Sequence, residues 1–260
     1  TMGRVVNLTL RLVGAANAYA VDITQGRLEM EGCDITSQGL ACVAIHGGAD
    51  PRLRRNRIHD GKSGGVFIYG NGLGTLEDND IVGNVLAGVE IKNGGNPTLR
   101  RNRIYDGKSG GVFVNTNGLG TLEDNDVFSN SFSGVEIREG GNPTLRRNRI
   151  HDGKQTGVFV FQNGLGTLED NHIFGNAYAG VVVRNGGNPT LRRNRINGNG
   201  YEAVWVYDKG GGTIEDNDLR GNARGAWDIS ADSEPLVKRA RNLEDPKGTP
   251  AVGTSPGPSS

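Results

Sequence analysis

The feature that most constrains the fold is a repeat of 46 residues built from two unlike halves of 23. The nonapeptide NPTLRRNRI begins at Asn96, Asn142 and Asn188, each 46 residues after the last. The segment TLEDND at 75–80 lies 23 residues after the related RLRRNR at 52–57. A fixed period in this range indicates a solenoid, in which each unit must stack on its neighbours to bury its apolar face.

Four positions of each 23-residue unit are nearly always aliphatic. Their columns pass through Leu76, Ile81, Val89 and Ile91, and the first runs from Leu53 to Val237. Positions two apart share one face of a strand, and most of these residues are β-branched, which favours strands. No stretch shows ten residues of helical periodicity. The sequence therefore predicts an all-β, single-stranded right-handed parallel β-helix of about ten coils, each with three short strands.

The expected domain organisation is simple. Residues 1–243 are predicted to form the β-helix, with 1–27 as irregular first coils, and 244–260 to form a flexible Pro/Gly/Ser-rich tail. At a strand spacing of ~4.8 Å, such a stack is on the order of 50 Å long.

Small polar and small apolar residues also follow the period. An Asn column runs from Asn56 to Asn217, which predicts an asparagine ladder at a bend, because Asn tolerates unusual backbone angles and can bond its counterpart in the next unit. Glycine columns indicate turns or close backbone approach. Cys33 precedes the Asn column in the same slot, whereas Cys42 belongs to another column. Both are expected to be core residues without a disulfide.

The arginine-rich repeats resemble a nucleic-acid contact, but their charge is balanced locally. Lys plus Arg and Asp plus Glu each total 29. Reading every 23 residues from Glu31 to Lys238 gives strictly alternating signs, and the next column alternates in the same way from Arg55 to Arg239. Because neighbouring strands lie ~4.8 Å apart, the alternation of sign places opposite charges next to one another, so that they pair across strands instead of repelling. A nucleic-acid partner needs a continuous basic track, so this class is excluded.

Two outward columns depart from this pattern and form the candidate site. One column directly follows the position of Val89 and the other directly follows the position of Ile91. Along both columns, units with aromatic residues alternate with units that carry charged residues. We expect them to form a face that binds an extended ligand through exposed aromatics about 10 Å apart. The alternative is that the rings only pack against the aliphatic parts of the neighbouring charged side chains. The candidate residues are Phe67, Tyr69, Glu90, Lys92, Phe113, Glu136, Arg138, Phe159, Phe161, Arg184, Trp205 and Tyr207.

Signals for catalysis are weak. Glu90 and Glu136 are two units apart, roughly 10 Å, near the upper limit for an inverting carboxylate pair. The segment His59-Asp60-Gly61-Lys62 and its copies are interpreted as turn residues. The four histidines lie in different units, so no metal site and no cofactor is expected.

With these columns established, the chain resembles the right-handed parallel β-helix superfamily, which includes pectate lyases, polysaccharide hydrolases and mannuronan epimerases. The sequence RNRIHDGKSGGVFIYGNGLGTLEDNDI at 55–81 is most similar to the β-helix part of F-box-only proteins. That resemblance covers roughly 28–230 and implies a surface that recruits substrates to a ubiquitin ligase. The chain shows no F-box and no Asp-Pro-His-Asp epimerase motif.

The sequence thus favours a non-catalytic recognition scaffold that binds a carbohydrate or another extended ligand along the aromatic and charged face. The alternatives are a protein-interaction module of a larger polypeptide and a polysaccharide lyase, hydrolase or epimerase. No apolar run approaches the ~18 residues of a membrane helix, so no membrane partner is expected. No signal peptide is visible, which favours the cytoplasm. An open first coil is expected to allow end-to-end self-association.

Overall fold

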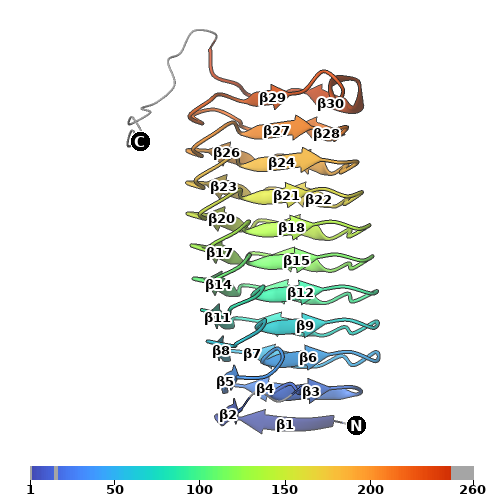
Figure 1. Ribbon diagram of the computed structural model, residues 1–260, viewed down its shortest axis with the longest axis vertical. Helices are drawn as coiled ribbons and strands as arrows, with labels where there is room; N and C mark the ends of the chain where they lie inside the picture. Colours follow the sequence, from blue (N-terminus) through green and yellow to red (C-terminus); the bar gives the residue numbers. More distant parts are fainter. Residues whose placement is uncertain (1, 15–16, 247–260) are drawn as a thin grey trace.

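The computed structural model describes residues 2–14 and 17–246, which form a right-handed parallel β-helix. Its coils stack along one axis as a rod, with the first coil at one end and the last at the other (Figure 1). Three parallel sheets, here called A, B and C, form its sides. In the described ranges helical structure is limited to the 3-10 helix η1 (Glu234–Leu236), and no helix there is long and apolar enough to cross a membrane.

Sheet A consists of eleven strands. They are β1 (Met2–Val6), β4 (Arg27–Glu31), β7 (Arg52–Arg54), β10 (Thr75–Glu77), β13 (Thr98–Arg100), β16 (Thr121–Glu123), β19 (Thr144–Arg146), β22 (Thr167–Glu169), β25 (Thr190–Arg192), β28 (Gly212–Glu215) and β30 (Val237–Ala240).

Sheet B consists of nine strands. They are β2 (Thr9–Leu12), β5 (Asp34–Ser37), β8 (Arg57–His59), β11 (Asp80–Val82), β14 (Arg103–Tyr105), β17 (Asp126–Phe128), β20 (Arg149–His151), β23 (His172–Phe174) and β26 (Arg195–Asn197).

Sheet C consists of ten strands and carries the candidate face. They are β3 (Val21–Ile23), β6 (Val43–Ile45), β9 (Val66–Ile68), β12 (Val89–Ile91), β15 (Val112–Val114), β18 (Val135–Ile137), β21 (Val158–Val160), β24 (Val181–Arg184), β27 (Val204–Tyr207) and β29 (Trp227–Ile229).

The aliphatic columns fill the interior, as predicted. Leu76, Ile81, Val89 and Ile91 are at most 1% exposed, and each belongs to a continuous core cluster that runs through the coils. Cys33 and Cys42 are buried free thiols. Between the irregular first and last coils the strands pair in register, so a 23-residue shift moves a side chain one strand along the rod and keeps it on the same face.

The predicted asparagine ladder is present and extends one coil further than expected. Asn102 donates through its backbone N–H and its Nδ2 to Asn125 Oδ1, at 2.9 and 3.0 Å, and the same two bonds recur along the column. Asn242 accepts the last of them from Asn217. A second ladder, missed by the sequence reasoning, passes through Asn84, Asn130, Asn176, Asn199 and Asn222.

The last coil corrects one prediction. Ile214 pairs with Arg239 and Gly212 with Val237, a shift of 25 residues, so Val237, Lys238 and Arg239 do not continue their predicted columns. The turn that contains η1 accounts for the two extra residues. Arg241 takes the place predicted for Arg239 and pairs with Asp216 at 2.6 Å. The first coil is also irregular in length, because Met2 pairs with Arg27, 25 residues on, and Val21 with Val43, 22 residues on. Of the predicted tail at 244–260, residues 247–260 lie outside the described residues, whereas Glu244 and Asp245 accept hydrogen bonds from Trp227 and Gly221.

The charge columns form ion pairs between neighbouring coils. Arg101 bonds Asp78 through Nε at 2.8 Å, and Arg147 bonds Asp124 in the same way at 2.9 Å. Alternate coils therefore neutralise one another.

These ion pairs predict an acid-sensitive fold. Hydrogen bonds from Arg55, Arg54 and Arg4 lower the pKa of Glu31 to about 2, and Arg147 lowers the pKa of Asp124. A carboxylate whose pKa is depressed in the folded state stabilises that state fully above its unfolded pKa and loses this contribution as pH falls through the folded pKa. We therefore expect the thermal unfolding midpoint to fall as pH drops from the ordinary glutamate value of 4.5 towards about 2.

Circular dichroism at a series of pH values measures this effect. In about 1 M salt, where the Debye length is about 3 Å, the acid-induced loss should be smaller, because the exposed pairs are screened. A midpoint that does not change on acidification would show that the ladders do not stabilise the fold.

Candidate functional site

The structure brings all twelve candidate residues together on the outer face of sheet C. They form two outward columns in seven consecutive coils, from β9 to β27: one column lies between the two buried aliphatic positions of each strand, and the other directly follows the second of them. The register places Glu136 between Phe113 and Phe159, and Val182 between Phe159 and Trp205. Aromatic and charged coils therefore alternate along the rod.

The rings on this face are less exposed than predicted. Along single strands, Phe67 stacks on Tyr69 with ring centroids 4.4 Å apart, Phe159 on Phe161 at 4.3 Å, and Trp205 lies 4.7 Å from Tyr207. All six rings are half-buried. Side chains two apart on a strand stand side by side, so each ring covers a face of its partner. The face thus offers stacked ring pairs on β9, β21 and β27 and a single half-buried ring, Phe113, on β15, rather than fully exposed platforms.

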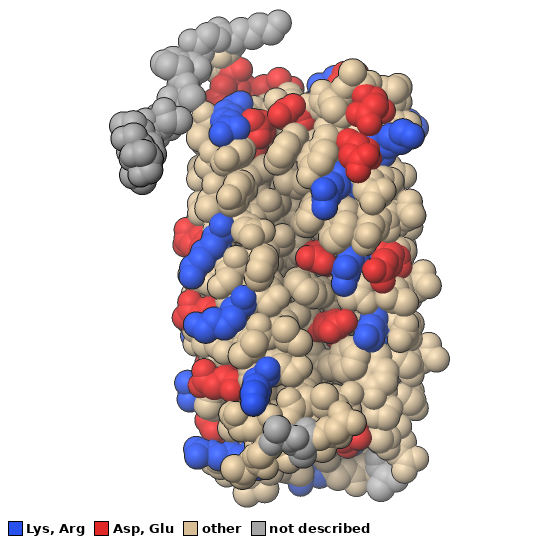
Figure 2. Space-filling view, viewed as in Figure 1, with Lys and Arg blue, Asp and Glu red and all other residues tan. Residues whose placement is uncertain are grey.

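The coils between the rings carry ion pairs within one strand. Lys92 lies 3.7 Å from Glu90, and Arg138 lies 3.4 Å from Glu136. The Lys92 ammonium also lies 4.7 Å from the centre of the Phe67 ring, a cation–π distance. Figure 2 shows charged residues gathered in bands along the rod, with a largely uncharged band between them.

Glu136 is the most perturbed carboxyl of the face. Burial between the flanking rings raises its pKa, and Arg138 opposes this effect only in part. Phe113 and Asn115 occupy the coil between Glu136 and Glu90, and Asn115 donates to Glu90 at 3.2 Å. A half-buried carboxyl with a raised pKa can take part in proton exchange.

A pocket of about 220 Å³ lies at the N-terminal end of the face. Tyr19, Leu40, Phe67 and Leu86 form its apolar wall, and Glu90 and Lys92 line it as well. Tyr19 comes from the first coil, and its ring lies 6.5 Å from that of Phe67. Its burial raises its pKa. Sequence reasoning missed Tyr19, because the first coil does not follow the 23-residue period.

Sheet B carries a second group of stacked aromatic side chains. Tyr105, Phe128, His151 and Phe174 stack in successive coils at centroid distances of 4.7, 5.3 and 4.5 Å. The prediction that His59 and His151 are turn residues is wrong, because each ends a strand and the turn begins one residue later.

Both nitrogens of these two histidines are occupied. His151 bonds Asp126 at 2.9 Å and Asp152 at 2.8 Å, and His59 has the equivalent partners Asp34 and Asp60. No group of three or more His, Cys, Asp or Glu side chains in the described ranges is arranged to hold a metal ion.

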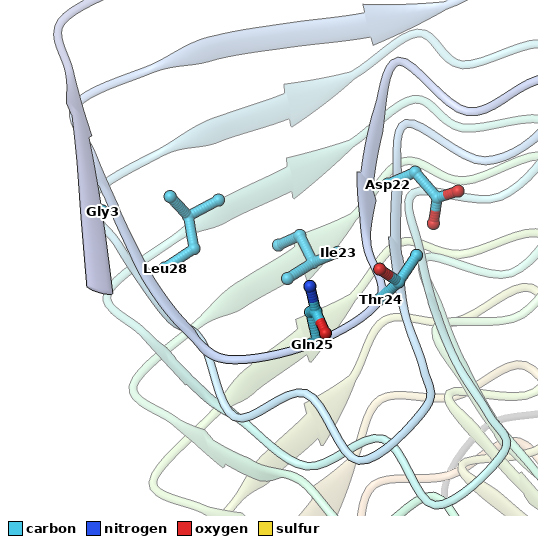
Figure 3. A pocket seen from close by; sticks show the side chains of 6 residues that line it. All are labelled: Gly3, Asp22, Ile23, Thr24, Gln25 and Leu28. Atoms are coloured by element: carbon cyan, nitrogen blue, oxygen red, sulfur yellow. The ribbon is translucent and has the colours of Figure 1, made fainter. Parts of the chain in front are cut away.

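A further cavity of about 290 Å³ lies at the first coil, beside β1 and β3 (Figure 3). Ile23 and Leu28 lie towards one another inside the coil, whereas Asp22 points away from it. This cavity lies at the end of the core and is lined by both apolar side chains (Ile23, Leu28) and polar ones (Asp22, Thr24, Gln25). End-to-end association through this coil stays a prediction.

Several solved structures share the fold of this chain. The periplasmic alginate epimerase AlgG superimposes with a TM-score of 0.72 at 16% identity, over 84% of this chain and 69% of that one. The A-module of the Azotobacter vinelandii mannuronan C-5 epimerase AlgE6 gives 0.71 at 18% identity, over 85% of this chain and 65% of its own. The AlgE4 A-module from the same organism gives 0.69 at 15%, over 94% and 86%. At these identities the likeness shows the fold alone.

Comparison of the sequence with family models identifies the same fold. No curated protein sequence matches the chain. The family model described as "Right handed beta helix region" matches residues 4–131 and 87–240. These matches span nearly all of the described coils, and the chain belongs to the right-handed β-helix family.

Proposed function

We propose that the chain is a non-catalytic recognition scaffold that binds a carbohydrate along the outer face of sheet C. The observation that carries this proposal is the set of stacked ring pairs on β9, β21 and β27, with ion pairs on β12 and β18 between the first two of them. Equivalent groups recur every two coils, about 10 Å. An extended polymer with a regular repeat can meet such a series several times, so that weak contacts add up along the chain.

The chemistry of the face suits a sugar chain. Half-buried rings supply apolar edges and partial faces, and neighbouring Glu, Lys, Arg and Asn side chains supply hydrogen-bond donors and acceptors for hydroxyl groups. The solved structures that share the fold include alginate epimerases, which supports a carbohydrate ligand.

One observation favours a protein partner as the second candidate. Leu86, Phe132 and Tyr178 occupy equivalent positions in the turns between sheets B and C, two coils apart. They are 54%, 47% and 44% exposed. An exposed apolar ridge of this kind is typical of protein interfaces. It is also consistent with the resemblance of the repeats to the β-helix part of F-box-only proteins.

The proposal is tested with the double variant Phe159→Ala/Trp205→Ala in a binding screen of neutral and acidic polysaccharides. We expect the affinity of the native chain to fall about tenfold or more in the variant, because aromatic side chains dominate binding energy at such surfaces. The matched control is Tyr105→Ala/Phe128→Ala, which removes two stacked rings from sheet B and should retain binding.

The same samples separate the other candidates. Absence of binding by the native chain across the screen would contradict a carbohydrate ligand. Equal losses in both double variants would place the site elsewhere or show a loss of folding. New reducing ends, unsaturated products or epimerised units would identify an enzyme and assign a catalytic role to the face.

A further inference from the structure

One coil of sheet C breaks the alternation of the face. In β12 and β18 a glutamate stands two residues before the cation, as in Glu90 with Lys92 and Glu136 with Arg138. In β24 the glutamate position is taken by Val182, which is 4% exposed, and the cation is Arg184. Arg184 therefore lacks the carboxylate that its two counterparts have. It makes no ion pair with any residue that the structure describes.

The surroundings of Arg184 are aromatic. The central carbon of its guanidinium lies 5.3 Å from the Phe159 ring, and 5.7 Å from each of Phe161 and Tyr207. Its Nε is buried and, like the Nε of Arg138, has no hydrogen-bond partner in the described structure, but only Arg138 has a carboxylate within ion-pair distance. An unpaired donor and a partly desolvated charge both cost stability unless a ligand satisfies them.

We infer that Arg184 is a carboxylate-binding subsite, so that the sugar chain bound along sheet C carries carboxylates. The inference rests on the proposed function and narrows its ligand. A guanidinium presents its donors in a planar fork that matches the two oxygens of a carboxylate. Rings on both sides in the neighbouring coils, from Phe161 and Tyr207, exclude water from that contact and strengthen it.

The charge pattern argues against a polyphosphate at the same place. A phosphate chain would need cations in successive coils. Here Lys92 and Arg138 are already neutralised by glutamates of their own strands. One unpaired guanidinium among rings instead fits a single carboxylate beside a sugar ring.

The test compares two forms of one polymer, polygalacturonate and its fully methyl-esterified derivative. We expect the native chain to bind the acidic form about tenfold or more tightly, because a charge-assisted hydrogen bond changes affinity by about that factor. This preference should decrease with added salt. Isothermal titration calorimetry measures both affinities.

Two variants remove the subsite in different ways. Arg184→Gln deletes the charge, whereas Val182→Glu keeps Arg184 and supplies the glutamate found at the same register in β12 and β18. Both variants should bind the two polymers alike. The control is Arg149→Gln on sheet B, whose guanidinium lies 5.6 Å from the Phe174 ring and which should retain the preference.

The outcomes separate this inference from the proposed function. Equal binding of both polymers by the native chain, unchanged in Arg184→Gln, would overturn the subsite and leave a carbohydrate-binding face in place. Binding of neither polymer would overturn the subsite and count against a carbohydrate ligand. A preference that survives in both variants would place the carboxylate at another residue.

Discussion

Replacement of Asn125 with alanine is expected to lower the free energy of unfolding by about 4 kcal/mol. Asn125 Oδ1 accepts hydrogen bonds from the backbone N–H and the Nδ2 of Asn102, and its own Nδ2 donates to Leu99 and Asn148. All of these groups are buried. The substitution leaves at least two donors without partners, and each unsatisfied buried group costs about 1–3 kcal/mol.

Urea unfolding followed by circular dichroism measures the change. Asn96→Ala is the matched control, because its side chain is exposed at a turn and its loss should have little effect. If the two variants unfold at the same urea concentration, the ladder does not stabilise the coils. A biphasic transition in Asn125→Ala would show that the stack separates near this coil, since each coil contacts only its neighbours.

Replacement of Gly111 with alanine is expected to destabilise the fold by about 3 kcal/mol or more. A Cβ at this position would lie 2.5 Å from Gly134 O and 2.5 Å from Val127 Cγ1. The carbonyl cannot move away freely, because it accepts the Val112 N–H at 2.9 Å. The glycine is therefore needed for close approach between coils.

The thermal unfolding midpoint measures this effect, and Gly3→Ala is the control. A Cβ at Gly3 would make only an ordinary contact, 3.5 Å from Leu28 Cδ1. A Gly111→Ala protein as stable as the native chain would show that the coils separate readily enough to admit a methyl group, which would contradict the tight stacking described above.

Periodicity explains why so much of the fold could be predicted. In a parallel β-helix a shift of one period moves a residue one strand along the rod, so each column of the sequence becomes a ladder in space. Leu76, Asn102 and the arginine–aspartate pairs follow from this rule alone. The second asparagine ladder has the same signal, but its column alternates with Gly61, Gly107 and Gly153, which hid it.

The remaining features depend on departures from the period. The turn with η1 adds two residues and moves the pairing of Asp216 from Arg239 to Arg241. Tyr19 reaches the pocket from a coil whose lengths differ from 23. Ring exposure could not be predicted either, because it depends on how neighbouring side chains such as Phe159 and Phe161 stack.

The most direct test of the account uses the fluorescence of Trp205. The chain contains two tryptophans, so Trp205 is the single reporter in a Trp227→Phe variant, which keeps an aromatic ring in the last coil. The account predicts that a polysaccharide that binds this variant shifts the Trp205 emission to shorter wavelength and saturates at the concentration where binding saturates. Binding that reaches saturation with no change in Trp205 emission would show that the ligand lies elsewhere and would contradict the assignment of sheet C as the recognition face.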